Sequence, residues 1–190
     1  MKNNILKSTL LLVLAVTFAS FTTISNKNVD VEKSQLAWKA YKVTGSHSGT
    51  IVLKSGNLSF DGDQLTGGAF TVDMTTLAVT DIQGEYADKL KGHLKSGDFF
   101  AVADNPHANI TFTNVKSSGK NSYTVVADLT IKGITKPVTF EISIYGSKAT
   151  ASLKVDRTKY DIKYGSSSFF DNLQDKAIYD EFDLVVDLQF

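Results

Sequence analysis

Strict alternation of apolar and polar residues, repeated in separate segments, is the feature that most limits how this chain can fold. The segment at the C-terminus shows it most clearly, with apolar residues at Phe182, Leu184, Val186, Leu188 and Phe190. A period of two residues is typical of a β-strand that buries one face and leaves the other in water. The sequence therefore predicts a mainly β protein built from antiparallel strands.

The same alternation occurs in several earlier segments. Its apolar positions are Leu36, Trp38 and Ala40; Phe70, Val72 and Met74; Tyr123, Val125, Ala127, Leu129 and Ile131; Val138, Phe140, Ile142 and Ile144; and Ala149, Ala151, Leu153 and Val155. Turn-forming pairs such as Lys132-Gly133 separate these segments. Many strands joined by short turns favour a sandwich or a closed barrel, and the alternation alone does not separate the two.

One segment follows a helical period instead. Its apolar residues are spaced by four: Tyr86, Leu90 and Leu94. This spacing predicts one short helix at about residues 83–95. Thr80 and Gln83 have the spacing of a capping box at the start of that helix.

The first 19 residues have the composition of a secretory signal peptide. Lys2 and Lys7 precede an uncharged apolar run at residues 10–19. That run is shorter than the ~20 residues a membrane-spanning helix needs, which disfavours a retained anchor. We expect cleavage after Ala19 and a periplasmic or secreted protein.

The remaining chain is expected to form a linker at residues 20–31 and one domain at residues 32–190, because about 170 residues suit a single core. Cleavage removes Lys2 and Lys7 from 20 basic residues, leaving 18 against 20 acidic ones. Such a near-neutral chain has no strong field for nucleic acid, and no later segment is apolar enough for stable membrane insertion. Cysteine is absent, so disulfides do not stabilise the fold.

Strings within the expected domain resemble the YceI-like family of exported lipid-binding barrels. They are Trp38, 45–50, 68–74, 90–100, Asn105-Pro106 leading into 110–112, 128–138, 156–158 and 180–182. The strings at 90–100 and 128–138 are the most specific. The resemblance implies an eight-stranded, antiparallel, lipocalin-like barrel with a helix beside it. It also implies a lumen that holds a long-chain amphiphile, such as a polyisoprenoid or an isoprenoid quinone.

The aromatic composition agrees with an apolar ligand, since the chain has 12 Phe, 7 Tyr and 1 Trp. An eight-stranded barrel is just wide enough to be filled by side chains or to hold one slim ligand. At ~0.3 kcal/mol per heavy atom, an isoprene unit contributes roughly 1.5 kcal/mol, so micromolar binding (~8 kcal/mol) needs about five or six units. The sequence thus favours a carrier of long-chain isoprenoid lipids. A packed structural or stress-response barrel without a ligand is the alternative.

The candidate ligand-contacting residues are large apolar side chains near the expected lumen. They are Trp38, Phe70, Met74, Leu94, Phe99, Phe100, Phe112 and Leu129. Phe169 and Phe170, adjacent in a serine-rich loop, form either a lid over the barrel mouth or an anchor for the loop. Arg157 faces either a polar head group at the opening or an exposed network of ion pairs.

No motif for catalysis or for a cofactor is present, neither Gly-x-Ser-x-Gly nor a phosphate-binding loop. The histidines, His47, His93 and His107, lack the close spacing of a zinc site, so no metal is expected. His93 and Asp98 suggest an acid–base pair of a hydrolase or isomerase, but we expect His93 to hold the helix against a strand. We therefore expect a binding protein and not an enzyme, with no cofactor beyond a bound lipid or quinone, and a homodimer is left open.

Overall fold

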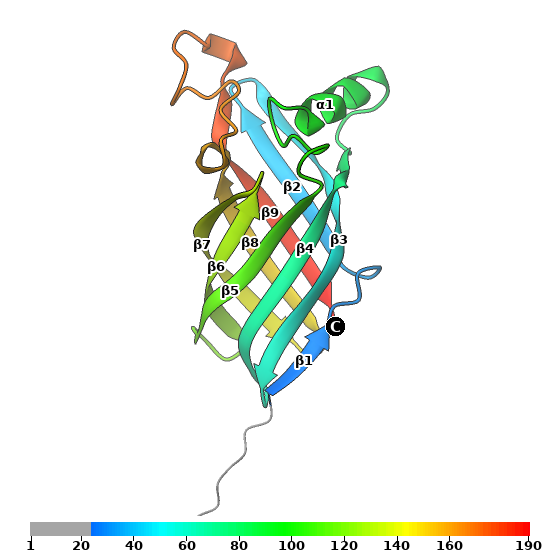
Figure 1. The fold of residues 1–190 in the computed structure, drawn as a ribbon, viewed down its shortest axis with the longest axis vertical. Coiled ribbons are helices and arrows are strands. Elements are labelled where there is room, and N and C mark those ends of the chain that lie inside the picture. The colour runs from blue at the N-terminus through cyan, green and yellow to red at the C-terminus, as the bar shows by residue number, and fades with distance from the viewer. Residues whose placement is uncertain (1–23) are drawn as a thin grey trace, which may run out of the picture.

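The strands of the computed structural model, which describes residues 24–190, form one antiparallel sheet that closes on itself (Figure 1). The expected signal peptide lies outside the described residues. The strands are β1 (Ile24–Asn28), β2 (Gln35–Lys42), β3 (Gly45–Asp61), β4 (Gln64–Val79), β5 (His107–Ser117), β6 (Ser122–Ile131), β7 (Ile134–Tyr145), β8 (Lys148–Asp156) and β9 (Ile178–Gln189). Neighbouring strands pair in chain order from β2 to β9, and β2 pairs with β9. The eight strands β2–β9 therefore form a closed barrel, as the family resemblance implied.

The alternation along each strand decides which side chains enter the barrel. In β6, Tyr123, Val125, Ala127, Leu129 and Ile131 are all buried, whereas the residues between them are not. The β6–β7 turn is Lys132-Gly133, and both residues have positive φ, at 51° and 71°. A two-residue turn of this kind matches the twist of a hairpin and fixes the register, which keeps the alternating apolar residues of β6 and β7 on the inner face.

Part of the expected linker is a strand. The loose linker predicted for residues 20–31 does not hold for Ile24–Asn28, which pair as β1 with Asn57–Asp61 of β3. On β3, only Gly45–Ile51 pair with β2, so without β1 the rest of this edge of β3 would have unpaired backbone groups. Main-chain hydrogen bonds do not require apolar side chains, which is why a polar segment fills this edge.

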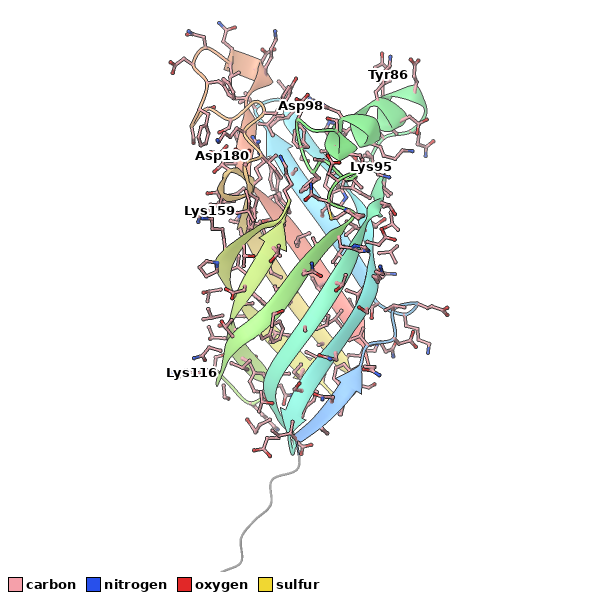
Figure 2. All side chains as sticks on the ribbon, viewed as in Figure 1. Tyr86, Lys95, Asp98, Lys116, Lys159 and Asp180 are labelled. Carbon is pink, nitrogen blue, oxygen red and sulfur yellow. The ribbon has the colours of Figure 1, made fainter. Side chains whose placement is uncertain are left out.

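The single α-helix of the described residues is α1 (Glu85–Lys95), as the four-residue spacing predicted. The predicted capping box is wrong, because the N-cap is Gly84 and no side chain caps the helix. The Thr80 backbone N–H instead donates to the Ser48 carbonyl at 2.9 Å, which holds Thr80 at the end of the sheet. Tyr86 lies on the outer part of the helix and is 78% exposed (Figure 2).

The two ends of the barrel differ. We call the end formed by the β3–β4, β5–β6 and β7–β8 turns the base, and the opposite end the mouth. At the base, interlocking side chains close the barrel, each 4% exposed or less: Leu58, Phe60, Leu65, Tyr123, Val125 and Ala149. At the mouth lie α1, the segment 96–106 that follows it, and the β8–β9 connection at residues 157–177 (Figure 1). This connection contains two short 3-10 helices, η1 (Arg157–Tyr160) and η2 (Gln174–Lys176).

Candidate functional site

An apolar cavity of about 160 Å³ lies inside the barrel, measured as the space open to the centre of a water molecule. Side chains from all eight barrel strands line it, together with Leu94 of α1 and Phe99 and Phe100 after it. One water needs ~10–15 Å³ on this measure and two to four polar partners, so the volume is ample but the lining is unsuited to water. The interior is therefore not packed solid, and none of the tightly packed residues named at the base lines the empty space.

Aromatic rings form one wall of the cavity. The rings of Phe70, Phe112 and Phe140 contact in series, with centroids 5.7 Å apart at each step. Two glycines make room for this wall. A Cβ atom at Gly56 would lie 2.2 Å from Phe70 Cδ1, and one at Gly68 would lie 2.9 Å from Phe112 Cε2. The absence of a side chain at these two glycines, on the neighbouring strands β3 and β4, therefore gives the two rings their space.

Trp38 forms another part of the wall and is fixed by a hydrogen bond. Its indole Nε1 donates to the Ala78 carbonyl at 3.1 Å, and only 8% of the residue is exposed. The ring lies against Gly49, its register partner on β3. Because the indole N–H already has an acceptor, Trp38 presents apolar carbon to the cavity.

The segment after α1 forms a roof over the cavity. Phe100 N–H donates to the Leu94 carbonyl at 3.1 Å, which turns the chain back toward the barrel. Phe99 is 6% exposed, and its ring packs against His93 and against Tyr164 of the β8–β9 connection. Phe100 meets Phe182 of β9 edge-on. Leu94, Phe99 and Phe100, which we call the roof, thus cover part of the cavity at the mouth.

Arg157 is the one charged side chain in the cavity lining. It is 4% exposed, so the predicted alternative of an exposed ion-pair network is wrong. Its Nε donates to the backbone carbonyl of Tyr179 at 3.1 Å. Its Nη1 donates to the carbonyl of Ile162 at 2.8 Å, and its Nη2 donates to the carbonyl of Ile178 at 3.0 Å. Burial lowers the pKa of the guanidinium, and the carboxylate of Asp180 acts in the opposite direction. A buried cation held mainly by neutral carbonyls therefore stands at the mouth end of an apolar space.

The structure brings together all the sequence-predicted ligand residues except Phe169 and Phe170. The residues that line the cavity are Trp38, Phe70, Met74, Leu94, Phe99, Phe100, Phe112, Leu129 and Arg157. Phe169 and Phe170 lie on the β8–β9 connection, each about half exposed and outside the cavity lining. In this structure they do not contact the ligand space, and their role as a lid or an anchor stays a prediction.

Sequence reasoning missed other lining residues, such as Phe140, Phe182 and Leu184. Their inward positions follow from the same alternation of apolar and polar residues that predicts their strands, and this alternation is the signal that could have identified them. It also missed Asp180, which does not line the cavity but lies 3.7 Å from Arg157 Nη2.

The acid–base alternative has little geometric support. His93 Nε2 lies 3.4 Å from Asp98 Oδ2, but neither residue lines the cavity, and their side chains are 34% and 62% exposed. The His93 ring packs edge-on against Phe99 and Tyr164, so it holds the helix against two loops and not against a strand as predicted. Within residues 24–190, no group of three or more His, Cys, Asp or Glu side chains is placed to hold a metal ion. In the same region, every helix is too short or too polar to cross a membrane.

Comparison with known proteins places these features in a family. The profile of the YceI-like domain matches residues 28–190. Protein YceI of Escherichia coli O157:H7 is 32% identical over 143 residues, which cover 70% of this chain and 72% of that protein. The UPF0312 protein of Pseudomonas putida (strain KT2440) is 36% identical over 98 residues, or 52% of this chain. The match spans about half of that relative, 49% of its length.

Solved structures share the fold. BcnA of Burkholderia cenocepacia superposes with a TM-score of 0.67 at 21% identity, covering 84% of this chain and 98% of that chain. A polyisoprenoid binding domain from Saccharophagus degradans, described as implicated in plant cell wall breakdown, gives 0.61 at 17% identity, covering 88% and 99%. At these identities the likeness concerns the fold.

Proposed function

Because this chain belongs to the YceI-like family, we propose that it is a periplasmic or secreted carrier that sequesters a long-chain isoprenoid lipid or a similar amphiphile in its barrel. The observation that carries this proposal is the apolar cavity inside a closed barrel. An apolar chain leaving water gains ~25 cal/mol per Å² of buried surface. The polyisoprenoid-binding description of the Saccharophagus domain supports the same class of ligand.

The size of the cavity adds a requirement. Its volume of about 160 Å³ is close to the ~150 Å³ of an engineered cavity that binds benzene. The closed barrel therefore has room for roughly one isoprene unit, whereas micromolar affinity needs about five or six. We infer that a long ligand displaces the roof and extends through the mouth, because the base is packed. Phe169 and Phe170 stand on the connection that such a ligand would pass.

Export is part of the proposal and rests on residues 1–19. Their short positive start and apolar run support a cleaved signal peptide. A barrel that shields a lipid chain is of use in an aqueous compartment that lipids must cross. No nucleic acid is included among the partners, because the near-neutral chain offers no basic surface of sufficient strength. A homodimer is compatible with this proposal.

A binding role fits the cavity better than a catalytic one. Arg157 is the one charged side chain of the lining, and it has neither a nucleophile nor a base beside it in that lining. The packed barrel without a ligand is disfavoured by the volume that the side chains leave open.

The test is recovery of a ligand. The full chain is purified from its exported fraction, extracted with organic solvent and examined by mass spectrometry. We expect a stoichiometric apolar compound with a long unbranched or isoprenoid tail. A clean extract, together with a delipidated protein that binds no isoprenoid alcohol at micromolar concentration, would refute the carrier function.

A further inference from the structure

Along β8 and β9, the side chains that face the lumen change from apolar to charged at the mouth. The inward register pairs are Ala151 with Val186, Leu153 with Leu184, and Val155 with Phe182. One step further along each strand stand Arg157, which lines the cavity, and Asp180, which lies beside Arg157 and outside the cavity lining. Arg157 Nη2 and Asp180 Oδ1 are 3.7 Å apart, and Asp180 lies at the mouth end of the barrel (Figure 2). We call these two residues the mouth pair.

Both members of the mouth pair have hydrogen-bonding capacity left over. A guanidinium carries five N–H donors, and carbonyls accept from three of those of Arg157. Asp180 Oδ2 accepts from the Ser168 hydroxyl at 2.6 Å, but Asp180 Oδ1 is buried and has no hydrogen-bond donor. Buried polar atoms are nearly always paired, so an acceptor without a donor, 3.7 Å from Arg157 Nη2, is a group that a ligand hydroxyl can pair with.

The charges around the mouth pair are already balanced. The Asp180 carboxylate offsets the guanidinium of Arg157, and Asp156 stands near it as a second acid. The Ser168 hydroxyl holds Asp180 in place, so an incoming anion would meet a carboxylate that cannot easily move away. Adding a third charge beside a buried ion pair is unfavourable, because the new charge loses water without gaining an unshared partner.

We propose that the mouth pair selects an uncharged, hydroxyl-bearing head group over a phosphorylated one on the same isoprenoid tail. A hydroxyl oxygen accepts from a spare Arg157 N–H, and its proton is donated to Asp180 Oδ1. One group then satisfies both members of the pair. This inference rests on the proposed function, since the tail must occupy the cavity for its head to reach the pair.

The test compares ligands that share one tail. The full, delipidated chain is loaded with the neutral dye N-phenyl-1-naphthylamine. The dye is then displaced by geranylfarnesol, its methyl ether or geranylfarnesyl phosphate below their aggregation limits, because this tail has the roughly five isoprene units that micromolar affinity needs. We expect the alcohol to bind about tenfold or more tightly than the phosphate, with the ether in between, because the ether accepts a hydrogen bond but donates none.

A variant isolates the carboxylate. Asp180→Asn keeps an acceptor for Ser168 and removes the negative charge, so the preference for alcohol over phosphate should shrink at least several-fold. Asp171→Asn, exposed on the same connection, is the matched control and should keep the wild-type ratio. Tighter binding of the phosphate by the wild-type chain would overturn this inference alone, as would an unchanged ratio in a folded Asp180→Asn variant. Failure of all three ligands to displace the dye would overturn the proposed function with it.

Discussion

Filling the cavity from one strand should weaken ligand binding without unfolding the protein. Ala151 of β8 faces the cavity, and Ala151→Phe adds six carbon atoms, about the size of the benzene ring that a comparable volume accepts. The ligand then loses room for about six heavy atoms. At ~0.3 kcal/mol per atom, this costs the complex ~1.8 kcal/mol, or roughly a 20-fold rise in Kd. Because the ring enters existing space, the free energy of unfolding should change by less than ~1.5 kcal/mol.

The assay is dye displacement by geranylfarnesol, with urea unfolding of the same samples. Ser152→Phe is the matched control, because Ser152 is the next residue on the same strand and is exposed on the outer face. It should bind like the wild type. Wild-type affinity in a folded Ala151→Phe variant would mean that the ligand sits elsewhere. Unfolding of the variant by several kcal/mol would mean that the lumen has no usable room.

Three further outcomes concern stability. Gly49→Ala should destabilise the barrel by ~3 kcal/mol or more in urea, because the new Cβ would lie 1.8 Å from a backbone carbonyl oxygen on β4. Gly67→Ala is the control and should change the stability little, because its nearest contact lies at 3.6 Å. Equal effects of the two substitutions would contradict this prediction. Tyr160 has a buried hydroxyl without a partner, so Tyr160→Phe should be neutral or stabilising by ~1 kcal/mol. Burial raises the pKa of Tyr160 to about 12 from 10.0, so the wild type should lose stability as the pH rises from 10 to 12 and the variant should not lose that part. Hydrogen bonding from Tyr41 lowers the pKa of Asp183 below 3.8, so the stabilisation by the charged carboxylate is present above pH 4 and is lost on acidification. Asp183→Asn should therefore lose less stability than the wild type below pH 4. An unchanged dependence of stability on acid pH would refute this.

The sequence by itself determined which residues face inward. The period-two pattern from Tyr123 to Ile131 is a local property of an extended chain, and the structure buries each of its apolar members. The four-residue spacing of α1 is local in the same sense. For this reason cavity residues such as Trp38, Phe70 and Leu129 can be predicted without any contact between strands.

Tertiary structure decided what depends on contacts between distant segments. Closure of the barrel joins β2 to β9, where the Tyr41 hydroxyl donates to the Asp183 carboxylate across 142 residues of sequence. The β1 strand pairs with β3 because β2 begins too late along β3 to cover that edge. The free volume is a small difference between the space that the barrel encloses and the side chains that fill it, so glycines such as Gly56 alter it. Arg157 and Asp180 meet because a long connection returns the chain to the same end of the barrel. No local pattern encodes such distances, because packing and pairing across the whole ring set them.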